Sequence, residues 1–261
     1  MKQNFADNSW TTVRDALQSG KPTVAILPCG ATEAHGPHLP LNTDVIISDA
    51  MASRASRMLS ERGYAVAVLP PLAYMPAGYA QAFPGTISVS AETARAMLLD
   101  IADSLKGQGF ACLAFANSHF DPANVAMLRE AADAIRAQGL PVAFADFTRR
   151  RLAQTLTEEF QSGACHAGRF ETSILLATRP DLVDDEKRRQ LPDNPSSLTD
   201  AFSRGAKTFE EAGGPDAYFG YPRDASAREG EESLRIMAAA LVEAVELLLD
   251  PSAMPEKLRN K

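Results

Sequence analysis

Short apolar runs alternate with amphipathic stretches along most of this chain, and this alternation constrains the fold more than any other feature. The run at 23–28 ends at Cys29-Gly30, and the amphipathic stretch at 45–62 follows an Asn-Thr-Asp cluster and stops at Gly63. Such apolar runs are typical of buried strands, whereas a polar cap, a periodic stretch and a glycine are typical of a helix. The pattern predicts strands at 23–28, 65–69, 110–116 and 142–145, and helices at 45–62, 90–106, 122–138, 149–160, 170–177 and 225–249.

Strands that alternate with helices predict an α/β fold with a mostly parallel sheet flanked by helices on both faces. No linker divides the 261 residues, so we expect a single domain over 1–261. The segment 190–220 is rich in Pro, Ser, Asn, Asp and Gly, a composition typical of a lid, an interface loop or a mobile linker. Sheets of this kind bind ligands beyond the carboxyl ends of their strands, where the loops 29–44 and 117–121 begin.

Charge and composition exclude several classes of partner. The formal net charge is −7, which argues against a nucleic-acid partner. No apolar run approaches the roughly 18–20 residues of a membrane helix, and the first residues contain no apolar leader segment, so we expect no membrane partner. The three cysteines, Cys29, Cys112 and Cys165, lie far apart, which predicts reduced thiols and a cytoplasmic location.

Carboxylates and histidines are concentrated in the two loops that follow predicted strands. The first loop contains Glu33, His35 and Asp44, and the second contains His119 and Asp121. In extended backbone, alternate residues point the same way, so each Glu-x-His or His-x-Asp pair presents two ligands on one side. Imidazole together with carboxylate suits zinc, manganese or iron better than calcium. The two loops therefore predict a metal site above neighbouring strands.

Charge balance favours two ions over one. Glu33, Asp44 and Asp121 supply three negative charges against the four positive charges of two divalent cations. The remaining charge matches a bridging hydroxide, the nucleophile of many two-metal hydrolases. We expect Zn²⁺ first, with Mn²⁺ or Fe²⁺ as alternatives. Taken singly, Asp44 and Asp121 have a simpler interpretation, because each lies at the start of a predicted helix and can cap it.

The fourth histidine, His166, opens the segment Cys165-His-Ala-Gly-Arg-Phe-Glu171 just before an apolar helical stretch. A histidine in this place can donate a proton to a departing nitrogen or orient a carbonyl, and Glu171 can hold that histidine or accept from water. An equally simple interpretation makes both residues polar groups at the start of a helix.

The stretch PCGATEAHGPHLPLNTD at 28–44 resembles the N-terminal signature of the creatininase (creatinine amidohydrolase) family. NSHFD at 117–121 and HAGRFETSILLATRPDLV at 166–183 are similar to two further family blocks, as are FPGTIS at 83–88 and GYPRDASAREG at 220–230. The resemblance spans about residues 20–250. It implies a single α/β domain, two divalent metals, hydrolysis of a non-peptide C–N bond and a homo-oligomer, commonly a hexamer.

The resemblance also implies residue roles. Glu33, Asp44 and His119 would bind one ion, and His35, Asp44 and Asp121 the other. His166 would be the catalytic residue on the substrate side, and His38 would support or pack the loop without binding metal. Our own mechanistic hypothesis adds Glu171 as a support for His166.

Departures from the family pattern point to a substrate other than creatinine. The one tryptophan, Trp10, is far from the third block, and Asp121-Pro122 replaces a longer carboxylate and its neighbour. Our candidates for substrate contacts are Tyr79, Gln81 and Phe120.

The sequence thus predicts a metal-dependent amidohydrolase that cleaves a cyclic amide, a lactam or a formamide in a small molecule. Two alternatives remain open at this point. One is a non-catalytic metal- or ligand-binding member of the same fold, because a fold alone does not imply activity. The other is a cysteine hydrolase that uses Cys165 or Cys29.

Overall fold

A four-stranded, fully parallel sheet lies at the centre of the computed structural model, which describes residues 1–250. Its strands are β1 (Thr23–Cys29), β2 (Ala65–Val68), β3 (Cys112–Asn117) and β4 (Val142–Phe144), in the order β2-β1-β3-β4. In the central pair, Cys29 lies opposite Asn117. The carboxyl ends of β1 and β3 are therefore adjacent, so both chemically rich loops start side by side.

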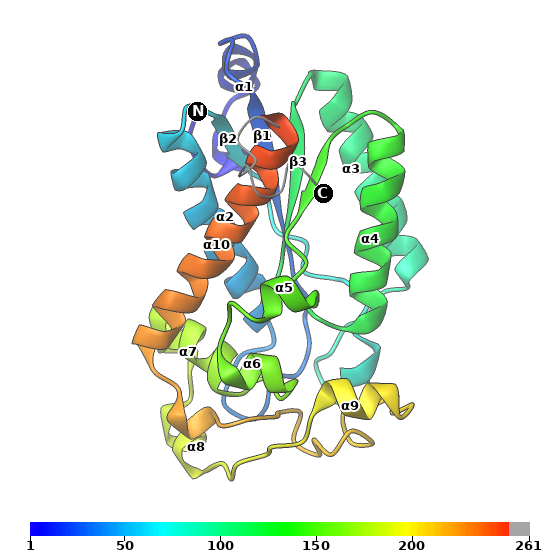
Figure 1. The fold of residues 1–261 in the computed structure, drawn as a ribbon, viewed down its shortest axis with the longest axis vertical. Coiled ribbons are helices and arrows are strands. Elements are labelled where there is room, and N and C mark those ends of the chain that lie inside the picture. Colours follow the sequence, from blue (N-terminus) through cyan, green and yellow to red (C-terminus); the bar gives the residue numbers. More distant parts are fainter. Residues whose placement is uncertain (251–261) are drawn as a thin grey trace.

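Helices cover both faces of this sheet, because alternate residues of the buried strands point to opposite sides. Val24 and Ile26 belong to one hydrophobic cluster, and Ala25 and Leu27 belong to the other. The first face is covered by α2 (Thr43–Glu61), α7 (Arg169–Thr178) and α10 (Ala227–Leu249), and the second by α1 (Trp10–Leu17), α3 (Ala91–Gln108) and α4 (Pro122–Ala137). In Figure 1, α2 lies to the left of the sheet, α10 runs from the lower left up to the front of the strands, and α3 and α4 lie to the right. The expected α/β single-domain architecture is confirmed for residues 1–250, and residues 251–261 lie outside the described part.

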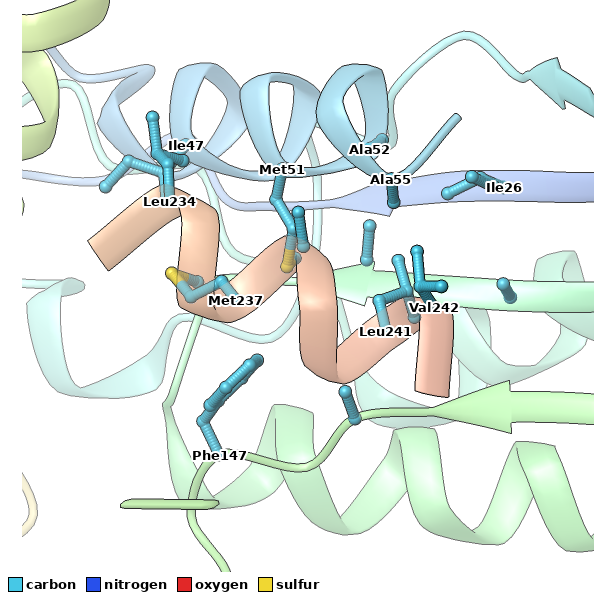
Figure 2. Packing of buried hydrophobic residues seen from close by; sticks show 14 of the residues in the cluster. Ile26, Ile47, Met51, Ala52, Ala55, Phe147, Leu234, Met237, Leu241 and Val242 are labelled. Atoms are coloured by element: carbon cyan, nitrogen blue, oxygen red, sulfur yellow. The ribbon is translucent and has the colours of Figure 1, made fainter. Parts of the chain in front are cut away.

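The packing of α10 against α2 forms much of the core on the first face. Met51 and Ala55 of α2 and Met237 and Leu241 of α10 are at most 1 % exposed, and Figure 2 shows Met51 pointing from α2 toward α10. Burial of large apolar side chains contributes about 1.5–3 kcal/mol each. This core holds the amino end of α2, which carries Asp44, firmly against the sheet.

The structure corrects two parts of the predicted element order. The helix expected at 149–160 is two short helices, α5 (Arg150–Ala153) and α6 (Glu158–Ser162), because Thr157 caps a new helix by accepting a hydrogen bond from Phe160 N. Three helices were not predicted, namely α1 near the start of the described chain and, after α7, α8 (Asp185–Gln190) and α9 (Leu198–Ser203). The short 3-10 turns are Phe5–Asp7, Gly78–Ala80, Pro180–Leu182 and Pro222–Asp224. Within residues 1–250, no helix has the length and apolar character needed to cross a membrane.

Candidate metal centre and cavity

The amino end of α2 lies directly against the end of β1, and a glycine makes this approach feasible. A Cβ on Gly30 would lie 2.6 Å from Val45 N and 2.8 Å from the carbonyl carbon of Asp44. The Ser118 hydroxyl, from the loop after β3, donates a 2.6 Å hydrogen bond to Asp44 O. These contacts bring Asp44 close to both loops, and the amino end of a helix also favours its negative charge.

Buried histidine and carboxylate side chains form overlapping clusters at this point. His119 Nδ1 lies 3.0 Å from Asp44 Oδ2 and 3.2 Å from Glu33 Oε1. His35 Nε2 lies 3.3 Å from Asp44 Oδ1 and 3.6 Å from Glu171 Oε2. Each of these two groups of three has ligand atoms within 4.8 Å of one another, and Asp44 belongs to both. Glu33, His35 and His166 form a third group that meets the same distance. The arrangement can hold two cations that share one carboxylate.

A backbone carbonyl sets the orientation of the ring in His35, His119 and His166. The bonds run from His35 Nδ1 to Glu33 O at 3.1 Å, from His119 Nε2 to Pro76 O at 2.6 Å, and from His166 Nε2 to Ala34 O at 2.9 Å. Because a carbonyl only accepts, the nitrogen facing it carries the proton. In the neutral form of each ring, the opposite nitrogen has a lone pair directed into the cluster, the tautomer that metal binding requires.

Unpartnered buried atoms show that the site suits a cation. His35 Nε2 and Asp44 Oδ2 are buried without a hydrogen bond of acceptable geometry. Buried polar atoms are normally partnered, so atoms of this kind mark a place for an ion or ligand. Three carboxylates, Glu33, Asp44 and Glu171, lie within this cluster and are nearly inaccessible to water. Divalent cations fit this donor set, because they supply the charge that it needs.

Without a cation, protons compensate for part of this charge. Burial works against protonation of His35, but the carboxylates of Asp44, Glu171 and Glu33 raise its pKa to about 10. Burial likewise opposes ionisation of Asp44, yet His35 and His119 hold its pKa below the usual range. Burial raises the pKa of Glu171 to about 8. Protons and cations therefore compete for the same atoms.

His166 has a different environment from the other two clustered histidines. Its ring packs against the rings of His35 and Phe209, each with a centroid separation of 4.3 Å. Burial and the neighbouring His35 lower its pKa well below 6.5. Nδ1 lies 3.9 Å from Glu33 Oε1. His166 is thus a neutral base that faces the cluster.

Two carboxylates occupy places that differ from our expectation. Asp121 is outside the clusters, because its Oδ1 caps α4 by accepting a 2.7 Å hydrogen bond from Ala123 N. Its other oxygen, Oδ2, is buried and unpartnered beside the cavity described below. Glu171 accepts from Ala167 N and faces His35, rather than supporting His166 as we predicted. The structure therefore brings Glu171, and not Asp121, to His35 and Asp44.

A cavity of about 600 Å³ opens above the clusters. Glu33, Asp44, His119, His166 and Glu171 form its floor, and Tyr79 and Phe120 line it as candidate substrate contacts. Gln81 does not line it, because this residue is exposed at the end of the Gly78–Ala80 turn. His38 lies away from the clusters and its Nε2 is 2.9 Å from Thr172 Oγ1, consistent with a packing role.

Sequence reasoning missed a large part of the cavity wall. Leu198, Phe202 and Phe209 come from the segment 190–220, and Phe160 comes from α6. The only sequence signal was the unusual length and composition of that segment.

The cysteines do not support a thiol nucleophile. Cys29 and Cys112 are buried in the core, and Cys165 lines the cavity. Burial and the nearby Glu171 raise the pKa of the Cys165 thiol, which disfavours the reactive thiolate.

Comparisons with known proteins agree with the resemblance. The sequence profile of the Creatininase family, described as creatinine amidohydrolase, matches residues 6–245. A mycofactocin precursor peptide peptidase of Mycobacterium ulcerans (strain Agy99) is 34 % identical over 228 residues, which cover 84 % of this chain and 83 % of that protein. A creatinine amidohydrolase of Pseudomonas putida is 31 % identical over 179 residues, covering 62 % and 66 % respectively.

Solved structures agree with the sequence comparisons. A crystal structure of a creatinine amidohydrolase superposes with a TM-score of 0.74 at 26 % identity, covering 95 % of this chain and 98 % of that one. Two further creatininase structures, one described as a manganese form and one as a zinc–zinc form of a variant, each superpose with a TM-score of 0.73 at 25 % identity. On the match across residues 6–245, the chain belongs to the creatininase family of amidohydrolases.

Proposed function

We propose that this protein is a dinuclear metal-dependent hydrolase that cleaves a carbon–nitrogen amide bond in a small molecule. One observation carries the proposal: two buried ligand clusters share Asp44 at the floor of a cavity. A shared carboxylate is what holds two cations close enough to act on one substrate.

In this proposal Glu33, Asp44 and His119 hold one cation, and His35, Asp44 and Glu171 hold the other. Asp121, which we first expected at the second position, has an unpartnered oxygen beside the cavity and is the alternative carboxylate. Zinc is our first choice, with manganese or iron as alternatives. When bound, the cations supply Lewis acidity that polarises a carbonyl and acidifies water.

His166 carries the proton in both directions. Its Nε2–H bond to Ala34 O leaves Nδ1 free to accept a proton. A ring that is neutral at the outset takes this proton from the attacking water and delivers it to the departing nitrogen. Because the low pKa of His166 leaves its ring neutral at first, the ring accepts a proton before it donates one.

The bond class has two candidates. Our first candidate remains a non-peptide amide of cyclic, lactam or formamide type. The second is the amide bond of a short peptide, favoured by the similarity to peptide peptidases over 84 % of the chain and by a cavity of about 600 Å³. Pockets of this size accommodate molecules considerably larger than a single small ring.

We also propose, on the family resemblance and on composition, a cytoplasmic homo-oligomer, with a hexamer as the first state to test. Neither a nucleic acid nor a membrane is a partner in this proposal.

The test begins with protein stripped by a chelator and then reloaded with zinc, manganese or iron. Metal content is measured by plasma mass spectrometry, and a panel of cyclic amides, formamides and short peptides is followed by chromatography. We expect two ions per chain and amine release that depends on them, unchanged in Cys165→Ser. Two bound ions with no turnover across the panel would favour the non-catalytic alternative. Turnover by chelated protein would refute the mechanism.

A further inference from the structure

The cavity has two chemically different ends. The floor consists of the buried acids and histidines of the clusters. At the other end, Thr148, Arg150, Gln154, Gln161 and Thr199 are exposed to solvent. In Figure 1, α5, α6 and α9 lie toward the lower end of the molecule, below the strands. A substrate whose amide reaches the floor therefore presents its far end to this polar mouth.

Aromatic side chains line the region between the two ends. Phe120 packs on Phe160 from one side, with ring centroids 5.3 Å apart. Tyr79 packs on Phe202 at 4.1 Å and lies 6.3 Å from Phe209. Walls of this type favour an apolar or aromatic group in the middle of the substrate.

Charge at the mouth is unevenly balanced. Among residues 1–250, Arg129 and Arg150 are the arginines that line the cavity. Arg129 is paired with Asp146, because its Nε and one terminal nitrogen lie 2.8 and 2.6 Å from Asp146 Oδ2. The same oxygen accepts from Arg149 Nε at 3.2 Å, and Arg149 does not line the cavity. Within the described residues 1–250, the Arg150 side chain has no carboxylate and no hydrogen-bond partner. Its neighbour Arg151 lies outside the cavity lining and pairs with Glu243 at 3.5 Å.

The unpartnered guanidinium of Arg150 provides a local binding group for an anion at the mouth of the cavity. The formal net charge of the chain is −7, so the protein as a whole repels anions. Arginine nonetheless offers a fork of donors that matches a carboxylate. The Arg150 guanidinium therefore favours a single orientation of a ligand, with the ligand's carboxylate at the mouth.

We propose that Arg150 binds the carboxylate of the substrate, and that the substrate class is an N-acylated apolar amino acid or short peptide with a free carboxylate. This deepens the proposed function and rests on it for the cleaved bond. The amide lies at the floor, the apolar side chain lies between the aromatic walls, and the carboxylate lies at Arg150.

The test compares N-acetylphenylalanine with its C-terminal amide, N-acetylphenylalaninamide, on zinc-loaded protein. Calorimetry gives the two dissociation constants at low and high salt, and chromatography follows amide hydrolysis separately. We expect the carboxylate to bind roughly fivefold more tightly at low salt, the range of a solvent-screened ion pair. Arg150→Gln should abolish this preference and raise KM with little change in kcat, because the cation acts far from the bond.

Arg151→Gln is the matched control, since it removes the adjacent charge outside the cavity, and both variants should melt like the parent. A preference that survives in Arg150→Gln would place the carboxylate at the metal centre and overturn the proposal. Equal binding of both ligands to the parent protein, or binding of neither, would also overturn it. If the protein prefers the carboxylate but hydrolyses no compound of the panel, the proposed function is refuted. The assignment of Arg150 as the carboxylate-binding residue would then still stand.

Discussion

Replacing Gly30 by alanine is expected to weaken metal binding without changing any ligand. The Cβ of alanine would lie 2.6 Å from Val45 N, and the three nearest atoms are all backbone atoms that cannot rotate away. Reaching ordinary van der Waals contact at 3.4 Å requires a displacement of about 0.8 Å. The element that must move is the amino end of α2, which carries Asp44.

This displacement is large on the scale of metal coordination. Ligand distances in a working site vary by only about 0.2 Å, so a shift several times larger removes Asp44 from one or both cations. Mutating a residue that holds a metal ligand in place typically weakens metal affinity 10–100-fold. We expect Gly30→Ala to weaken it by about 100-fold or more. Overpacking adds about 1–3 kcal/mol of destabilisation.

Chelator competition measures the metal dissociation constants, and circular dichroism gives the melting temperature. Gly107→Ala is the matched control, because Gly107 lies in α3 with no atom within 4 Å of an added Cβ. That control should keep its metal affinity and gain slightly in stability, as alanine favours the helix over glycine. Parent-like metal affinity in Gly30→Ala would show that the close approach of α2 to β1 does not position Asp44.

Three further predictions concern the cluster itself. Asp44→Asn should lose both cations by plasma mass spectrometry, whereas Asp49→Asn, which changes an exposed acid on the same helix, should keep them. Two ions retained in Asp44→Asn would contradict a shared ligand. His166→Gln should keep its metals while kcat falls about 10²–10⁴-fold, and an unchanged kcat would exclude its proton role. Metal-free protein should lose stability as pH rises from 6.5 to 8.5. The folded pKa of His35, about 10, and that of Glu171, about 8, lie above their unfolded values, so the folded state retains protons that the unfolded chain releases. Each such group contributes at most about 1.4 kcal/mol per pH unit. Thermal melts with saturating zinc should show the opposite slope, because cations displace these protons; a flat metal-free profile would contradict the charged cluster.

The strands and long helices were predictable because their signals are local. The run at 23–28 and β1 (Thr23–Cys29) differ by one residue, and the amphipathic stretch at 225–249 contains α10 (Ala227–Leu249). Hydrophobic periodicity and caps decide such elements within a few residues of sequence. The segment 149–160 misled us, because an apolar Leu156 fits a helical pattern while Thr157 begins a new helix.

The clusters were only partly predictable for a different reason. Glu33, His35, Asp44 and His119 lie in two loops whose strands are neighbours, so spacing and topology suffice to bring them together. The place of Glu171 depends on how α7 packs, which no short-range pattern encodes. Arg150 likewise stands out only once Arg129 and Arg151 are seen to have partners.

Different segments of the chain orient the metal ligands and line the cavity, which explains how one metal centre can act on different substrates. The three clustered histidines are oriented by carbonyls of Glu33, Ala34 and Pro76, which no side-chain substitution removes directly. The aromatic walls and the mouth come instead from 79, 120, 148–161 and 198–209, outside those ligand-orienting contacts. Substitutions in the walls can therefore change what the cavity accepts while the ligand tautomers stay fixed. For this reason the specificity of this chain must be sought at residues such as Phe202 and Arg150, and not at the metal ligands.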